Sequence, residues 1–434
     1  MRVLLAPGTT GIAKEIFNSL LACKDIELYG CGFDLIEAQE MKYRKFFYVP
    51  QPESSGQVLN AITSIAKNSD IDAIFICHDE WLREVSITKL PSGISNKVVN
   101  LPNNESLHLL SKRETYKNLT GRIYTPTTYD SVGTLTKYPL FLKPDRGQGS
   151  RGAKIINSLS DLNGITITDS SIIRTEFLLC EFLPGEEFTI DCFSNNSSQL
   201  LYTLARKRVV VSDGIASETH AIRLPEVSGW LEEISEYFKL SGAWFAQFKR
   251  SHRGDLKLLE VGIRVAGASG INRALGVNLA LMSLYQFLGQ PIEVINQYHD
   301  AIYWQKLNTV KVDFNFKNVY MDFDDTITNK QEFNSRVVQA IYDLHCRGAR
   351  IEILTRSKVP IESLLVSAGI NHLISKINYF NDDSPKSSKI DGNQNFLFVD
   401  DSFKERKAVF NKFGLKGLTL DPSAFQTRIE FRYS

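Results

Sequence analysis

The sequence lacks the features of a disulfide-stabilised or zinc-binding chain. Its 434 residues include only 6 cysteines, and no two of them form a Cys-x-x-Cys pair. Most lie in apolar runs, as Cys77 does in AIFICHD, where cysteine usually acts as a small buried hydrophobic residue. We therefore expect neither a disulfide framework nor a zinc site, and reduced thiols are typical of the cytosol.

Long apolar runs and an excess of one charge are also missing. No stretch reaches the roughly 18 apolar residues that a membrane span needs, and the start, MRVLLAPGTTG, has no signal-peptide pattern. The 50 basic and 49 acidic residues leave a formal net charge of +1, so no overall field attracts nucleic acid or an anionic membrane. We expect a soluble, cytoplasmic protein with no nucleic-acid or membrane partner; a homo-oligomer is left open.

What is present predicts several α/β and α+β domains. The chain is too long for one ordinary core, and 43% of its residues are hydrophobic. Short apolar strands alternate with helical patterns over residues 1–102, which is typical of a parallel α/β domain. Residues 103–305 show antiparallel strand pairs that turn at Gly, Asn and Asp. We expect residues 306–317 to be a connector and residues 318–434 to be a doubly wound α/β unit.

Individual elements can also be expected from these patterns. Strands are expected over residues 2–8, 25–32 and 72–79, with a helix over 12–23. Hairpins are expected over residues 177–194 and 244–267, the second turning near Arg253 and Gly254. In the last unit, helices are expected over residues 333–347, 360–369 and 403–413.

A glycine-rich segment in the middle of the chain has the composition of a phosphate-binding loop. Lys143 ends the apolar strand YPLFLKP and precedes the loop DRGQGSRGA. Glycine lets backbone N–H groups approach a polyphosphate closely, and the loop contains Gly147, Gly149, Ser150 and Gly152. By itself, the same composition would also suit a flexible hairpin loop.

Carboxylates follow at positions that suit a nucleotide and a cation. Glu181 and Glu187 flank the turn in CEFLPGEEFTID, where they suit the base and the ribose of adenosine, although a charged turn is the simpler alternative. Gln247 and Glu260 lie on the two strands of the hairpin expected over 244–267, so their side chains are expected to face one another and share a metal ion. Arg264, four residues further on, would then reach the transferred phosphate.

The order of these segments over residues 1–305 resembles the ATP-grasp superfamily, which includes carbamoyl-phosphate synthetase, biotin carboxylase and D-alanine–D-alanine ligase. HDEWL resembles the family's acidic turn, and SKRETYKNL its first basic motif, which implies that Lys112 binds ATP. FLKPDRGQGSRG, CEFLPGEEFTID and LLEVGIRVAG resemble its lysine–glycine loop, adenosine motif and metal–arginine motif. The resemblance implies ATP and Mg²⁺ as cofactors, phosphorylation of a small-molecule carboxylate with release of ADP, and attack by an amine.

The sequence departs from that family pattern at the metal site. Gly262 stands where the family usually has an asparagine, and Gln247 where many members have a carboxylate. Asn272 is a candidate for the missing oxygen ligand. Three arginines that follow the adenosine motif are candidates to bind an acidic substrate, with a solvated strand face as the alternative reading: Arg206, Arg208 and Arg223.

Acidic residues end two strands of the last unit. Asp322 and Asp324 follow the strand VYM, and Asp400 and Asp401 follow FLFV. Carboxylates at the C-terminal ends of strands face the ligand-binding edge of an open α/β sheet. Paired aspartates at i and i+2 can divide the roles of nucleophile and general acid–base. Thr355 ends a third strand and can bind a phosphoryl oxygen.

This order resembles the haloacid dehalogenase superfamily over residues 318–434, and FVDDSFKER is similar to its capless magnesium-dependent phosphatases. The resemblance implies that Asp322 forms an aspartyl phosphate and that Asp324 is the acid and base. It also implies that Lys386, or alternatively Lys389, neutralises the phosphate of a phosphoester substrate. The implied Mg²⁺ ligands are Asp322, Asp324, Asp400 and Asp401.

The combined prediction is a bifunctional enzyme, in which a carboxylate–amine ligase is joined to a phosphohydrolase. Two alternatives are a kinase-like transferase, and a nucleotide-binding regulator of an active phosphatase, which the glycine at 262 favours. The short stretch from Thr328 to Phe333 leaves no room for an inserted cap. We therefore expect an open phosphatase cleft, unless the ATP-grasp part or a neighbouring subunit covers it.

Overall fold

The computed structural model describes residues 1–50, 55–88, 90–131, 137–147, 152–162, 176–212, 214–295, 303–329 and 332–431. Gly149 and Ser150 of the predicted phosphate loop lie outside these ranges. Within them, no helix has the length and apolar character needed to cross a membrane.

The N-terminal unit is a parallel sheet with strand order β3-β2-β1-β4. Its strands are β1 (Arg2–Ala6), β2 (Glu27–Gly32), β3 (Lys45–Tyr48) and β4 (Ala73–Ile76). The helices between and after them are α1 (Gly11–Leu20), α2 (Leu35–Glu40), α3 (Ser55–Asn68), α4 (Asp79–Ile87) and α5 (Ser92–Ser95). The three strands expected from the sequence are confirmed. The edge strand β3 was missed because it has only four residues, none of them buried.

A small antiparallel sheet follows, with strand order β5-β8-β6-β7. It contains β5 (Thr128–Tyr129), β6 (Leu140–Pro144), β7 (Lys154–Ile156) and β8 (Phe177–Glu181). The helix α6 (Lys112–Leu119) precedes it, with Ser111 as N-cap. The hairpin expected over residues 177–194 is wrong, because β8 belongs to this sheet and β9 to the next one. Both runs are apolar and share a turn-like link, so the sequence does not show that they belong to different sheets.

The central sheet has the strand order β13-β12-β9-β10-β11-β14-β15-β23. Its first part consists of β9 (Glu187–Ser194), β10 (Leu200–Ser212), β11 (Ile215–Ile222), β12 (Gly242–Arg250) and β13 (Leu256–Gly262). The accompanying helices are α7 (Ser228–Tyr237), α8 (Gly270–Ala274) and α9 (Leu279–Phe287). The hairpin expected over residues 244–267 is confirmed, with Gly254 in its turn at φ 90°.

The expected connector over 306–317 is wrong, because this region continues the central sheet. β14 (Tyr303–Lys306) and β15 (Thr309–Val312) form a hairpin whose first strand pairs with β11. The C-terminal strand β23 (Arg428–Phe431) pairs with β15 in parallel. The segment looked like a linker because its strands are only four residues long and each has an exposed lysine, Lys306 or Lys311. The boundary expected at 318 therefore separates two sheets but does not separate the chain's last residues from the central sheet.

The C-terminal unit is a five-stranded parallel sheet with order β20-β19-β16-β21-β22. Its strands are β16 (Asn318–Met321), β19 (Arg350–Thr355), β20 (Ile374–Tyr379), β21 (Phe396–Val399) and β22 (Gly417–Leu420). The helices α10 (Ser335–Cys346), α11 (Glu362–Ser367) and α12 (Phe403–Phe413) confirm the three helices expected there. The four residues of β21 are all buried, as in a parallel sheet covered on both faces.

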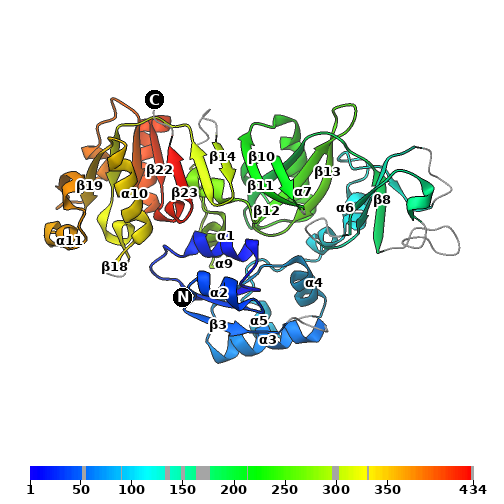
Figure 1. Cartoon of the computed structure of the whole chain (residues 1–434). Helices are drawn as coiled ribbons and strands as arrows, with labels where there is room; N and C mark the ends of the chain where they lie inside the picture. Colours follow the sequence, from blue (N-terminus) through cyan, green and yellow to red (C-terminus); the bar gives the residue numbers. More distant parts are fainter. Residues whose placement is uncertain are drawn as a thin grey trace.

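One apolar core joins the three parts of the molecule. It runs from Val3 and Ile16 of the N-terminal unit, through Tyr303 and Val310 of the central sheet, to Val319 in the C-terminal unit. Helix α1 contacts α9 and the turn before β23. Figure 1 shows α1 and α9 between the N-terminal sheet and the rest of the chain. The N-terminal unit, the central sheet and the C-terminal unit are thus packed against one another through a shared core.

Candidate functional site

The first candidate site is a pocket between the N-terminal unit and the β12–β13 hairpin. Its lining includes Asp79, Lys112, Gly147, Glu260 and Gly262. Lys112 begins α6, and its Nζ donates to the carbonyl of Gly147 at 3.1 Å and lies 3.7 Å from Glu260 Oε2. The structure therefore brings together a lysine, a glycine of the loop and a carboxylate that the sequence had placed far apart.

Lys143 lies deeper, at 8% exposure. Its Nζ donates to the hydroxyl of Tyr116 at 2.8 Å and to the carbonyl of Leu259 at 3.4 Å. Burial raises the pKa of Tyr116 well above its ordinary value, so the phenol stays protonated. Lys143, near the end of β6, thus contacts α6 and β13, the two elements that carry Lys112 and Glu260.

Gln247 and Glu260 are directly opposite each other in the β12–β13 hairpin, as the sequence predicted. Their oxygen atoms suit one Mg²⁺ ion, which in nucleotide sites commonly takes one or two protein ligands and completes its shell with phosphates. The metal role of the pair remains a prediction.

The β12–β13 hairpin explains why residue 262 is a glycine. Phe245 is its partner across the strands, and a Cβ at 262 would lie 2.3 Å from that ring. The aromatic ring occupies the space in which a side-chain ligand would stand. The replacement for that ligand suggested by the sequence, Asn272, is not placed to serve. Its amide is buried and bonded to Tyr202, Asp191 and Ser269.

Arg264 does not extend freely towards a phosphate. Its guanidinium is paired with both carboxylate oxygens of Asp79 at the start of α4, and it packs 5.0 Å from the centre of the Phe245 ring. Although burial opposes it, Arg264 holds the pKa of Asp79 below its usual value. The sequence signal for this partner was the acidic turn in HDEWL, which follows the last strand of the N-terminal sheet.

The predicted adenosine carboxylates are both in ion pairs. Glu181 accepts from the backbone N–H of Thr127 at 3.0 Å and is paired with Lys257. Glu187 lies between Arg208, at 2.9 Å, and Lys249, at 3.3 Å. Their binding role remains a prediction.

The three arginines proposed to bind an acidic substrate do not share one environment. Arg206 is 1% exposed and holds Asp191 through two hydrogen bonds of 2.7 and 2.9 Å. Arg208 is also buried, so neither residue lies on a solvated strand face or is free to bind substrate. Arg223, in contrast, lines a second pocket of mainly apolar residues beside β10 and β11.

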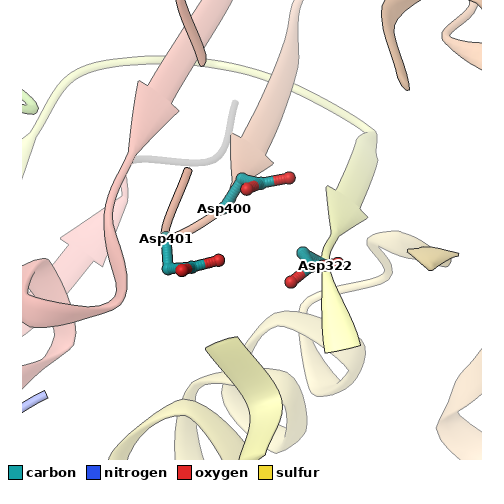
Figure 2. A group of neighbouring side chains, drawn as sticks. All are labelled: Asp322, Asp400 and Asp401. Carbon is teal, nitrogen blue, oxygen red and sulfur yellow. The ribbon is translucent and has the colours of Figure 1, made fainter. Parts of the chain in front are cut away.

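The second candidate site lies at the C-terminal ends of three adjacent strands, β19, β16 and β21, which end before or at Thr355, Asp322 and Asp400. Parallel strands direct these ends to one edge of the sheet. Figure 2 shows the carboxylates of Asp322, Asp400 and Asp401 turned towards a common space. Oxygen atoms from the three lie within 4.8 Å of one another.

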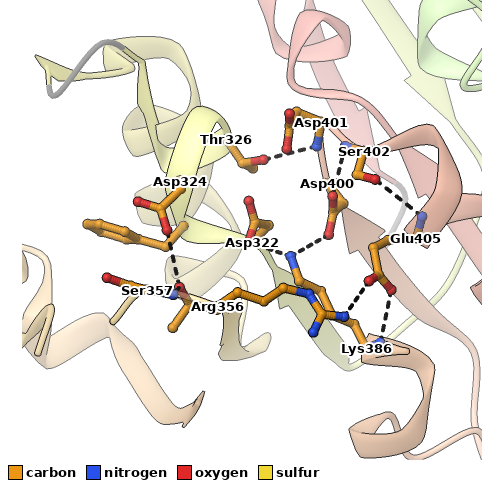
Figure 3. A network of polar contacts seen from close by, with 12 residues as sticks. Asp322, Asp324, Thr326, Arg356, Ser357, Lys386, Asp400, Asp401, Ser402 and Glu405 are labelled. Carbon is orange, nitrogen blue, oxygen red and sulfur yellow. Dashed lines mark hydrogen bonds and ion pairs between the residues drawn. The ribbon is translucent and has the colours of Figure 1, made fainter. Parts of the chain in front are cut away.

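Lys386 is buried between two of these carboxylates. Its Nζ lies 2.5 Å from Asp322 Oδ1 and 2.8 Å from Asp400 Oδ2 (Figure 3). The alternative residue left open by the sequence, Lys389, is exposed, so the structure places Lys386 beside these carboxylates, and its role remains a prediction. Burial alone would lower the pKa of Lys386, but the two carboxylates outweigh it and raise that pKa.

Burial and mutual repulsion raise the pKa values of the acidic groups in this site. Burial, and then repulsion from Asp400, raises the pKa of Asp322 to about 8 although Lys386 opposes the shift. Loss of water around its carboxylate, followed by Asp400 and Asp325, raises the pKa of Asp401 to about 6. Three carboxylates beside one lysine favour a divalent cation, because a cation lowers the cost of ionising all three. The donor set therefore fits Mg²⁺.

Asp324 is not part of this carboxylate group, which corrects the set of four metal-ligating side chains expected from the sequence. Its Oδ2 instead accepts from Thr355 Oγ1 at 3.5 Å. The i, i+2 spacing did not reveal this difference, because it does not show which neighbouring side chain each carboxylate contacts.

Glu405 is a supporting residue that sequence reasoning missed. Its carboxylate accepts from the Lys386 backbone N–H at 2.9 Å and from Arg356 at 2.6 Å. It lies three residues after Ser402, which caps α12. That spacing resembles an ordinary helix start and gave no sign of contact with the loop before β21.

Comparisons with known proteins support an ATP-grasp fold. Residues 174–310 match the family described as ATP-grasp in the biosynthetic pathway with Ter operon. No curated protein matches the chain.

Among the solved structures with a similar fold, three examples each match 70% of this chain. Rhizobium etli pyruvate carboxylase has a TM-score of 0.57 at 13% identity, and this chain spans only 30% of its length. The biotin carboxylase domain of Hydrogenobacter thermophilus 2-oxoglutarate carboxylase, in complex with MgADP and bicarbonate, has a TM-score of 0.55 at 14% identity and is 73% covered. An L-amino acid ligase from Bacillus licheniformis has a TM-score of 0.52 at 14% identity and is 78% covered. At these identities the likeness concerns the fold.

Proposed function

We propose that this chain is a bifunctional, Mg²⁺-dependent enzyme that carries an ADP-forming carboxylate–amine ligase site and a separate phosphoester hydrolase site of the haloacid-dehalogenase type. The pocket that joins Lys112, Gly147 and Glu260 supports the first activity. The Asp322–Lys386–Asp400 arrangement supports the second and is the observation that carries most weight.

In the ligase reaction, Lys112 and Lys143 would bind the phosphates of ATP, and Glu260 with Gln247 would hold the nucleotide's Mg²⁺. The γ-phosphate would pass to a substrate carboxylate, and an amine would displace the phosphate from the acyl phosphate. This chemistry consists mainly of positioning and charge neutralisation. The fold similarity to an L-amino acid ligase supports this class of reaction.

In the hydrolase reaction, Asp322 would attack the phosphorus of a phosphoester, and the bond from phosphorus to the ester oxygen would break. Asp324 would protonate the leaving alcohol and then take a proton from the water that hydrolyses the aspartyl phosphate. Lys386 would oppose the burial that raises the pKa of Asp322, so it would favour the ionised form of that carboxylate, and it would neutralise a phosphoryl oxygen. Mg²⁺, held by Asp322, Asp400 and Asp401, would supply the remaining positive charge.

The product of ATP turnover tests the ligase mechanism. Incubation with ATP, Mg²⁺ and a panel of amino acids and sugar acids should release ADP only when a suitable carboxylate is present. Hydroxylamine should trap an acyl hydroxamate, because it attacks acyl phosphates. Formation of AMP and pyrophosphate would contradict the proposal.

Lys143→Ala should weaken ATP binding about tenfold, or roughly 1.4 kcal/mol, because it removes one cation from the phosphate site. Titration calorimetry with MgATP measures this change. Lys306→Ala is the control, since that side chain is 61% exposed in the central sheet and does not line the pocket. Equal affinity for the Lys143 variant and the native chain would remove Lys143 from the site.

A nucleotide-binding regulator of the hydrolase is the second candidate function, because Phe245 fills the space beside Gly262. That function predicts ATP binding without substrate-dependent ADP release, together with a change in phosphoester hydrolysis when ATP is added. The ADP assay on the same preparation distinguishes the two functions.

A further inference from the structure

A loop of the N-terminal unit lies against the catalytic turn of the C-terminal unit. The loop, residues 21–26, joins α1 to β2. Its Lys24 Nζ lies 2.5 Å from Asp325 Oδ2, and the carbonyl of its Ala22 accepts from Asn329 Nδ2 at 3.3 Å. Asp325 follows Asp324 directly, so the loop contacts the segment that carries the proposed general acid.

The position of this loop is fixed by buried bonds on its other side. Arg273 of α8 is paired with Glu15 and donates to Ser19 Oγ at 3.0 Å. Asn278 Nδ2 donates to the carbonyl of Ser19 at 2.7 Å. Because α1 is held in this way just before the loop begins, Lys24 approaches Asp325 from a rigid support.

The turn that Lys24 contacts has an unusual backbone. Asp325 has φ 58° and ψ 7°, a left-handed conformation that few residues other than glycine adopt. Such conformations persist when their surroundings hold them, and they gather at functional sites. Since Asp325 and Asp324 share a peptide bond, a contact that holds Asp325 also restrains the backbone that carries the Asp324 carboxylate.

We propose that Lys24 is a positioning residue for the hydrolase site, supplied by the N-terminal unit. Its ion pair with Asp325 holds the turn so that Asp324 faces the leaving group of the phosphoester. The hydrolase site is therefore composite, with the 21–26 loop at the place where an inserted cap is missing. This inference rests on the proposed phosphohydrolase function.

The dependence of hydrolysis on the leaving group tests this role in the full chain. An alkyl ester such as glycerol 3-phosphate needs a proton on its leaving alcohol, whereas p-nitrophenyl phosphate releases a stable anion. Lys24→Met should lower kcat/KM for the alkyl ester about tenfold or more, within the range that general acids contribute. The same variant should lower kcat/KM for the aryl ester less than about threefold. This parameter includes only steps up to release of the alcohol.

Matched variants separate positioning from a general loss of structure. Lys24→Arg should restore most of the alkyl-ester rate, because it keeps the cation. Lys14→Met removes an ion pair of 3.0 Å with Glu37 from α1, the helix that precedes the loop, and should change the rate for neither ester. Equal losses for both esters in Lys24→Met, or no loss for either, would overturn the positioning role. Absence of hydrolysis of both esters by the native chain would instead overturn the proposed phosphohydrolase function on which it rests.

Discussion

Asp322→Asn should reduce phosphoester hydrolysis by at least about a thousandfold, since an amide cannot form the aspartyl phosphate on which the reaction depends. The substitution also removes one of three carboxylates grouped within 4.8 Å and the 2.5 Å partner of Lys386. Phosphate release from p-nitrophenyl phosphate in the presence of Mg²⁺ measures the effect. ATP binding should be unchanged, because the nucleotide pocket lies between other elements.

The control for this variant is Asp343→Asn, which changes an exposed aspartate on α10 of the same unit. It should retain the native rate. Native-like hydrolysis by Asp322→Asn would exclude the aspartyl-phosphate mechanism. Loss of both hydrolysis and ATP binding in a folded Asp322 variant would indicate that one shared site, and not two separate sites, binds ATP and the phosphoester.

Arg273→Met should destabilise the folded chain by about 3–5 kcal/mol, because it leaves Glu15 as an unpaired buried charge. Arg273 is 1% exposed, and its guanidinium bonds to Glu15, Ser19 and Thr427. Burial lowers its pKa to about 10, so the residue is still charged at neutral pH. The three partners belong to α1 and to the segment before β23, so one side chain links all three parts of the molecule.

Calorimetric unfolding should show a lower midpoint for Arg273→Met, and transitions that coincide in the native chain should separate as the units come apart. Lys239→Met is the matched control. It removes an exposed ion pair with Glu105, of 2.8 Å, whose side chains are 64% and 39% exposed, and such pairs contribute about 0–1 kcal/mol. Equal midpoints for the two variants would show that Arg273 does not join the units.

Local sequence determined the elements and the groups of residues that end them. The buried strand β21 was predictable from its continuous apolar run, and the helix α12 from its periodicity and its Ser402 cap, because these signals act over a few neighbouring residues. Gln247 and Glu260 were predictable as cross-strand partners because a hairpin with a glycine turn determines its own register. The acidic ends of β16 and β21 were predictable as one cluster because parallel strands end at the same edge.

Contacts between distant segments were decided only by the tertiary structure. Neither β23 beside β15, nor Lys24 beside Asp325, leaves a trace in the local pattern, since their partners lie 119 and 301 residues away. The same holds for the choice of Lys386 over Lys389, which depends on how a short turn packs on α12, and for Phe245 filling the space at Gly262. Hydrophobic periodicity determines which face of a segment is buried, but it does not determine which other apolar face packs against it. That choice is made when the whole chain packs, and it also determines which charged side chains form ion pairs.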